Sequence, residues 1–155
     1  MVFIGSMFGQ FSAPFIGPYC ASKAALASMT DSFAMELRPW GIPVSLIEAG
    51  VTQTSIWSKY EKRSNRLFER LPEAARELYG EHARQTQRHA MVEARNGMPA
   101  ERVARTVETA LSSVSPKLRY QVGADARAAI LGSSVLPRSL FHSITLARMG
   151  IRRRG

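Results

Sequence analysis

The chain has 155 residues, of which 45% are hydrophobic and 21% are charged, and its formal net charge is +9. This length and composition are typical of one globular domain with its own core. No stretch reaches the roughly 18–20 apolar residues of a transmembrane helix, and the N-terminus lacks a signal-peptide pattern. Cys20, the single cysteine, excludes an internal disulfide and is typical of a reducing compartment. These features predict a cytoplasmic protein.

The positive charge does not by itself predict a nucleic-acid partner. Basic residues are scattered over Lys59–Arg105 and are concentrated only in Arg152–Arg154. Aromatic residues that could stack on bases do not alternate with them. His82 and His89 lack an acidic or cysteine partner at ligand spacing, so we expect no metal.

The first elements are a strand, a loop and a helix. Residues 2–5 (VFIG) form an apolar, partly β-branched run, which predicts a buried parallel strand. Gly9–Pro18 contains the breakers of a loop, and Pro18 suits the first turn of a helix that reaches about Arg38. Four apolar residues at helical spacing are expected to supply the buried face of that helix: Leu26, Met29, Phe33 and Leu37.

Three side chains at the start of this region suggest proton-transfer chemistry. Tyr19 and Lys23 are four residues apart, so on a helix they share a face. A cation near a phenol favours the phenolate and lowers a pKa that starts near 10, which lets a tyrosine exchange protons near neutral pH. Ser6 precedes Tyr19 by thirteen residues. Cys20 has no positioned histidine base and is better interpreted as a packed thiol.

Ser6 and the run Pro18-Tyr19-Cys20-Ala21-Ser22-Lys23-Ala24-Ala25-Leu26 together resemble the active-site segment of the short-chain dehydrogenases/reductases. The resemblance implies that Tyr19 is the general acid/base, that Lys23 tunes it and binds the nicotinamide ribose, and that Ser6 orients the reacting oxygen. It also implies an α/β fold, here the C-terminal half of a Rossmann-like doubly wound parallel sheet with a helical substrate lid. Tyr19 and Lys23 are therefore expected to bind the cofactor as well.

The next strand is predicted at Pro43–Ile47 (PVSLI) and is followed by Glu48-Ala49-Gly50-Val51-Thr52-Gln53-Thr54. In the family, a proline-glycine pair and a later threonine at this place contact the nicotinamide. Gly50 and Thr54 match that pattern, whereas Ala49 stands where proline is usual. The resemblance therefore implies cofactor contacts from Gly50, Val51, Thr52 and Thr54. Thr54 could equally be a helix N-cap or turn residue.

Residues 55–97 are polar and helix-prone, and by resemblance they form the substrate lid. The aromatic residues of this section could line an apolar substrate pocket, or they could be local packing residues: Trp57, Tyr60, Phe68 and Tyr79.

Residues 98–135 are expected to hold the last large helix and strand. Pro99–Ser112 has an apolar face and Leu118–Val122 alternates as a strand does, with a short helix at Ala124–Leu131. The remaining residues, 136–155, are predicted to form a basic amphipathic helix and tail. That helix is expected to pack on the body or on a partner subunit, with at most weak peripheral membrane contact.

The family's glycine-rich T-G-x-x-x-G-x-G turn, its N-N-A-G segment and its catalytic asparagine are not found in the sequence. The resemblance therefore predicts the C-terminal part of such an enzyme, a single partial domain with segments 1–54, 55–97, 98–135 and 136–155. Because the sequence lacks this binding site for the dinucleotide phosphates, the chain alone is expected neither to bind the cofactor tightly nor to turn over substrate.

The function implied by the resemblance is an oxidoreductase that interconverts an alcohol and a ketone or aldehyde with NAD or NADP. IEAGVTQT and PYCASK resemble the steroid and retinol branch, which implies a lipophilic small-molecule substrate. The alternative is a non-catalytic fragment that associates with a full-length relative through the helix bearing Tyr19 and Lys23, as a homo- or hetero-oligomer. A serine hydrolase that uses Ser6 is disfavoured because I-G-S-M-F is not G-x-S-x-G.

Overall fold

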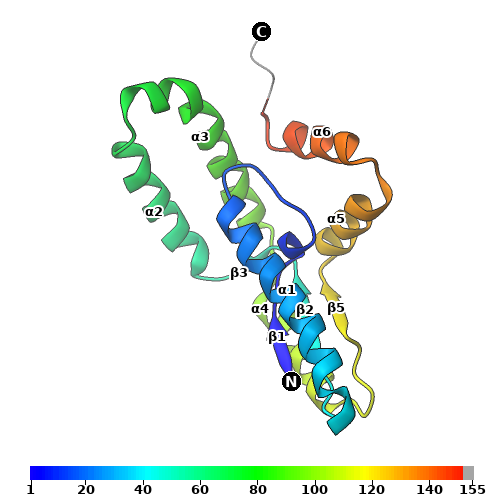
Figure 1. Cartoon of the computed structure of the whole chain (residues 1–155). Coiled ribbons are helices and arrows are strands. Elements are labelled where there is room, and N and C mark those ends of the chain that lie inside the picture. The colour runs from blue at the N-terminus through cyan, green and yellow to red at the C-terminus, as the bar shows by residue number, and fades with distance from the viewer. Residues whose placement is uncertain (152–155) are drawn as a thin grey trace.

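The structure is a computed structural model that describes residues 1–151 (Figure 1). Its short helical and extended elements are β1 (Val2–Ile4), η1 (Met7–Gly9), η2 (Arg38–Trp40), β2 (Ser45–Ala49), β3 (Thr52–Gln53), β4 (Met98–Pro99) and β5 (Arg119–Val122). Its α-helices are α1 (Gly17–Leu37), α2 (Ile56–Glu69), α3 (Glu73–Arg95), α4 (Ala100–Ser112), α5 (Ala124–Val135) and α6 (Arg138–Arg148).

A three-stranded parallel sheet in the order β1-β2-β5 organises the fold. Ile4 of β1 lies opposite Ile47 of β2, and Ile47 lies opposite Tyr120 of β5. β2 is buried along most of its length because it lies between the other two strands, as expected for a central strand of a parallel sheet. The carboxyl ends of β1 and β2 therefore meet at one edge, where the loops that follow them lie side by side.

The helices α1 and α4 cover opposite faces of this sheet (Figure 1). Phe3 stacks on Phe33 of α1, with ring centres 5.8 Å apart. Its neighbour Val2 packs against a core cluster that contains Ile47 and residues of α4, including Ala110. Because successive side chains of a strand point to opposite faces, these contacts place one helix on each face.

The helices α2 and α3 form an antiparallel hairpin that projects from the sheet in Figure 1. Its base is held by the short parallel pair of β3 and β4, in which Thr52 lies opposite Met98. Trp57 and Tyr60 contact each other edge to face at 6.3 Å, and the guanidinium of Arg84 lies over the ring of Phe68. These contacts show that the three aromatic side chains pack locally within the hairpin, and a role in lining a substrate pocket stays a prediction for them and for the exposed Tyr79.

Most of the predicted elements are confirmed with boundaries that differ by one or two residues, and the α/β class with a parallel sheet is confirmed. The short strands β3 and β4 were not predicted, and α5 continues to Val135 instead of ending at Leu131. The expected buried face of the first helix is wrong at Met29, which is 51% exposed. The positions of α1 that are buried are the smaller Cys20, Ala27 and Thr30, because close approach to the sheet favours small side chains.

The last helices pack near the start of the chain. Phe141 of α6 contacts Phe11 edge to face at 5.2 Å, which confirms packing of this helix on the body. Arg152–Arg154 of the predicted basic tail lie outside the described residues. Within the described residues, no helix is both long and apolar enough to cross a membrane.

Candidate active site

Ser6 lies two residues after the end of β1, at the carboxyl end of the sheet. It is the N-cap of η1, and its Oγ accepts a hydrogen bond from the backbone N–H of Phe8 at 3.3 Å. The residue is only 8% exposed. The local fold follows from the sequence because serine is a preferred N-cap, where its side chain satisfies an unpaired backbone donor.

Tyr19 and Lys23 lie on the same face of the first turns of α1. The Lys23 Nζ is 5.9 Å from the centre of the Tyr19 ring and donates a hydrogen bond to the carbonyl oxygen of Ile4 at 3.0 Å. The ring of Tyr19 also contacts Phe8 edge to face at 6.2 Å, and the residue remains 41% exposed. The lysine thus joins the tyrosine to the end of β1, while the tyrosine remains accessible to a small molecule.

The short helix η1 lies against α1 with little space between the two backbones. A methyl group built at Gly9 would lie 2.9 Å from the carbonyl oxygen of Lys23. This oxygen belongs to the helix backbone, so it cannot move away as a flexible side chain would. This close approach brings the segment after Ser6 to the face of α1 that carries Tyr19 and Lys23.

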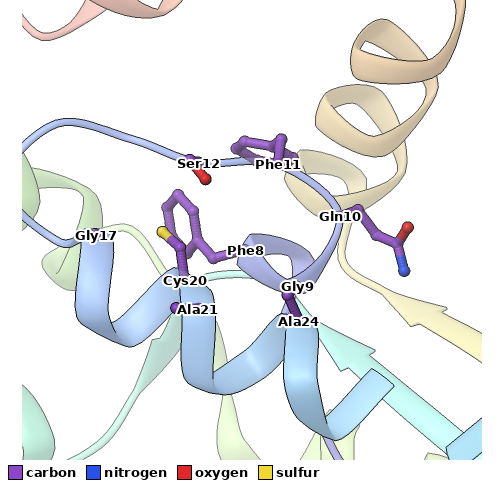
Figure 2. A pocket seen from close by; sticks show the side chains of 9 residues that line it. All are labelled: Phe8, Gly9, Gln10, Phe11, Ser12, Gly17, Cys20, Ala21 and Ala24. Carbon is purple, nitrogen blue, oxygen red and sulfur yellow. The ribbon is translucent and has the colours of Figure 1, made fainter. Parts of the chain in front are cut away.

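A pocket of about 230 Å³ lies between the loop after β1 and the first turns of α1 (Figure 2). Its lining is mainly apolar, with the rings of Phe8 and Phe11 on the loop and small residues on the helix. Cys20 also faces this pocket and is almost fully buried, in agreement with the predicted packed thiol. Its wall includes Phe8, whose ring contacts Tyr19, whereas Ser6, Tyr19 and Lys23 do not themselves line the pocket.

The segment after β2, for which cofactor contacts were predicted, is held by Asp125. The carboxylate Oδ2 of Asp125 accepts a hydrogen bond from the backbone N–H of Val51 at 2.7 Å, and both Gly50 and Gly123 leave room for this side chain. The hydroxyl of Thr52 donates to the carbonyl oxygen of Gly50 at 3.1 Å. The backbone donor of Val51 is therefore already used inside the protein.

Thr54, the last of the predicted cofactor contacts, is exposed, and its carbonyl oxygen accepts a hydrogen bond from the backbone N–H of Trp57 at 3.4 Å. Ser55, not Thr54, stands at the N-cap of α2. Thr54 is thus a turn residue with an accessible side chain.

The two segments of the predicted site are joined by a small core. Met7 of η1 and Ala126 of α5 belong to one buried cluster, and Val51 packs against it. The structure therefore brings the loop after Ser6 and the loop after β2 together at the carboxyl ends of neighbouring parallel strands, where ligands of open α/β sheets bind.

A charge cluster around the buried Glu48, beside this region, was not predicted from the sequence. Glu48 is 1% exposed, and its Oε1 accepts hydrogen bonds from Arg119 at 2.9 Å and from Gln10 at 2.5 Å. Arg119 also donates to Asp31 of α1 at 2.6 Å. The sequence offered one signal of this cluster, the carboxylate of Glu48 in an otherwise apolar strand. A buried charge of this kind needs a charged or hydrogen-bonding partner. The cluster fixes the loop after Ser6 to β2 through Gln10.

No cluster of metal-ligating side chains is found in the part of the chain that the structure describes. His82 and His89 lie on α3, and His89 is 4.0 Å from Glu93 one turn further on.

Comparison with known proteins agrees with this geometry. Residues 1–65 match the family model described as short chain dehydrogenase. Short-chain dehydrogenase/reductase family 9C member 7 of Mus musculus is 37% identical over 129 residues, which cover 81% of this chain and 41% of that protein. Retinol dehydrogenase 7 of Rattus norvegicus is 32% identical over 148 residues, covering 93% of this chain and 46% of that protein.

A third relative, 11-beta-hydroxysteroid dehydrogenase type 2 of Homo sapiens, is 33% identical over 130 residues, which cover 79% of this chain and 32% of that protein. The fold resembles a solved short-chain dehydrogenase from Streptomyces avermitilis with a TM-score of 0.63 at 22% identity, covering 97% of this chain and 52% of that one. Residues 1–65 are therefore similar to the short chain dehydrogenase family, and the chain shares its fold with part of one such protein. It spans less than half the length of these three curated relatives.

One prediction is corrected by these findings. The sequence was interpreted as the C-terminal part of a short-chain dehydrogenase, matched over nearly its whole length and lacking the cofactor-binding half. The family model matches only residues 1–65, the N-terminal part of this chain. The glycine-rich turn is missing from these 155 residues, but that does not place the chain at one end of a whole enzyme. Its assignment to the C-terminal part is withdrawn.

Proposed function

We propose that the chain supplies the proton-transfer site of an oxidoreductase that interconverts an alcohol and a ketone or aldehyde with NAD or NADP. The observation that carries this proposal is the contact of Lys23 with Tyr19 at the carboxyl end of β1, directly beside the segment that follows Ser6. In reduction, Tyr19 Oη would give its proton to the carbonyl oxygen while Ser6 hydrogen-bonds that oxygen. Lys23 would keep positive charge beside the phenol as the proton leaves.

A nicotinamide, when bound, supplies or accepts the hydride. The residues at the sheet edge fit its nicotinamide end: Lys23 and Tyr19 would contact the ribose, and Gly50, Val51, Thr52 and Thr54 would lie along the ring. The backbone N–H of Val51 already donates its hydrogen bond to Asp125, so it would not be available to the nicotinamide. The contacts of residues 50–54 with the nicotinamide would come from their other polar groups. The sequence holds no G-x-G-x-x-G turn for the phosphates, so we expect this chain to bind the dinucleotide weakly.

We propose a lipophilic alcohol as the substrate class. The rings of Phe8 and Phe11 line an apolar pocket, and Phe8 also contacts Tyr19. Two of the relatives are named as hydroxysteroid and retinol dehydrogenases. The helical hairpin within residues 55–97 would cover the substrate from one side, and the three observed strands would belong to a larger Rossmann-like, doubly wound sheet.

The proposal is tested in a chimera. The segment of Rattus norvegicus retinol dehydrogenase 7 that matches this chain is replaced by the chain itself, and oxidation of retinol and of other lipophilic alcohols is followed with NAD and NADP. We expect turnover of at least one of them. A folded chimera that binds the cofactor as the parent does, yet converts none of the alcohols, would contradict the proposed activity.

A second candidate function is association with a relative or with another copy through α1 and η2. Large apolar side chains are exposed there, notably Met35 at 71% and Trp40 at 72%, and exposed apolar patches commonly mark interfaces. Sedimentation velocity over a range of concentrations tests this. We expect a mass that rises with concentration for the parent chain and a monomer for Met35→Glu/Trp40→Glu, and a monomer in both cases would exclude self-association through this interface.

Two further proposals concern location. The first is a cytoplasmic location, which the single cysteine supports.

The second is at most weak peripheral membrane contact through α6. Leu140 and Ile144 of this helix are partly exposed beside Arg148, which supports such a contact. Equal binding to anionic vesicles by the intact chain and by a chain lacking residues 136–155 would exclude a membrane role for this helix.

A further inference from the structure

A basic groove runs along β5 on the side of the sheet remote from β1. It encloses about 600 Å³ and is lined by one face of α4, by β5 and by the start of α5. Arg102 and Arg105 come from α4, where their spacing of three residues puts them on one face. Lys117 precedes β5, and Arg127 lies on α5. We refer to these four residues and the space between them as the β5 groove.

The four cations of the β5 groove are exposed, and within the described residues none of them is within salt-bridge distance of a carboxylate. Arg119, which also lines the groove, differs from them because its guanidinium is paired with Glu48 and Asp31. No acidic residue lines the groove among the residues described. The groove therefore has a positive charge that the chain itself does not neutralise.

The outer edge of β5 offers backbone groups inside the same groove. The carbonyl oxygens of Leu118 and Val122 accept hydrogen bonds from the backbone N–H groups of Leu46 in β2 and of Gly50 just after it. Since successive residues of a strand turn their backbone groups to opposite sides, Arg119 and Gln121 turn theirs to the free edge. The carbonyl oxygen of Gln121 has only a long contact with the Arg127 Nε, at 3.4 Å.

We propose that the β5 groove binds an acidic peptide segment in an extended conformation, which adds to β5 as a further strand. Main-chain hydrogen bonds to the strand edge would supply the register, and the surrounding cations would select acidic side chains. A second copy of this chain is disfavoured as the occupant, because a two-fold contact across β5 would place the four cations against the same four.

Nucleic acid fits the groove less well than a peptide does. The aromatic residue that lines it is Tyr120, which packs against the core cluster of Ile47, and its hydroxyl oxygen accepts a hydrogen bond from the backbone N–H of Lys117 at 3.0 Å. Its ring is therefore not free to stack on a base.

The test is a fluorescence-anisotropy titration of the intact chain with a labelled peptide of alternating glutamate and valine, at about 0.05 M salt where charge contacts are little screened. We expect saturable binding that weakens about three- to tenfold in Arg102→Gln/Arg105→Gln. The matched control is Arg63→Gln/Arg66→Gln, which removes two exposed arginines of the same spacing from α2 and should leave the affinity unchanged.

Two further ligands complete the test. The same peptide with methylated backbone nitrogens keeps its charge but cannot pair with the strand, so it should bind more weakly than the parent peptide. A single-stranded oligonucleotide of equal charge should not compete. The proposal would be overturned by equal loss of affinity in both double variants, by equal binding of the methylated peptide, or by an oligonucleotide that displaces the peptide.

Discussion

At the scale of single residues, the site depends on how closely η1 approaches α1. Gly9 permits this contact because a side chain there would meet the Lys23 carbonyl oxygen at 2.9 Å. The three polar side chains of the proposed site could be named from sequence because Ser6, Tyr19 and Lys23 form a local pattern. The role of Gly9 could not be predicted from sequence, since it depends on the distance between the backbones of η1 and α1.

Gly9→Ala is therefore expected to destabilise the fold. The added methyl group must push η1 away from α1, and overpacking of this kind costs about 1–3 kcal/mol. The free energy of unfolding, measured by urea denaturation, checks this. Gly17→Ala is the control, because a methyl group there meets nothing within 4 Å, and its stability should be unchanged or slightly higher. Equal stability of the Gly9 variant and the parent would show that the contact is looser than described.

Tyr60 provides a prediction of pH dependence. Burial raises the pKa of Tyr60 above its ordinary value of 10.0, and a hydrogen bond with Ser64 opposes part of that effect. Because the pKa is higher in the folded state, the neutral phenol stabilises the fold fully below pH 10.0, and this stabilisation is lost as the pH rises towards the folded pKa.

Tyr60→Phe should accordingly lose less stability than the parent between pH 9 and pH 11, as measured by chemical denaturation at each pH. Tyr79→Phe, in which an exposed tyrosine of α3 is replaced, should follow the parent. The same alkaline loss of stability in Tyr60→Phe and the parent would place its source in another group.

At the scale of elements, helices and strands were largely predictable because apolar periodicity and proline or glycine breakers are local signals. The two-residue strands β3 and β4 carry no such signal. The partners of Glu48 were also hidden, since Arg119 lies 71 residues away in the chain and pairs with Asp31 across 88 residues. Similarly, the four cations of the β5 groove looked scattered in the sequence and are gathered only by folding.

The contact between the loop after β2 and α5 is a second long-range feature that the sequence did not reveal. Asp125→Ala should leave the Val51 N–H without its acceptor, at a cost of about 1–3 kcal/mol. Urea denaturation measures this loss, and Asp125→Asn, which retains an oxygen acceptor, should lose less. If alanine proved no worse than asparagine, the hydrogen bond would not be what holds this loop.

At the scale of the whole molecule, a small parallel sheet with a helix on each face brings two loops together at its carboxyl edge. The α/β class was predictable from the strand and helix patterns, and the proton-transfer residues from their spacing. The extent of the family match could not be predicted, because the resemblance was judged from short motifs. The family model covers residues 1–65. The central claim is that Tyr19 transfers the proton in an alcohol–carbonyl interconversion.

That claim is tested most directly by the turnover number of the chimera described above when Tyr19 is replaced by phenylalanine. Tyr19→Phe removes only the hydroxyl group, so kcat should fall by about 10²–10⁴-fold while the cofactor affinity stays nearly the same. An unchanged kcat in Tyr19→Phe would contradict the assignment of Tyr19 as the proton donor and acceptor.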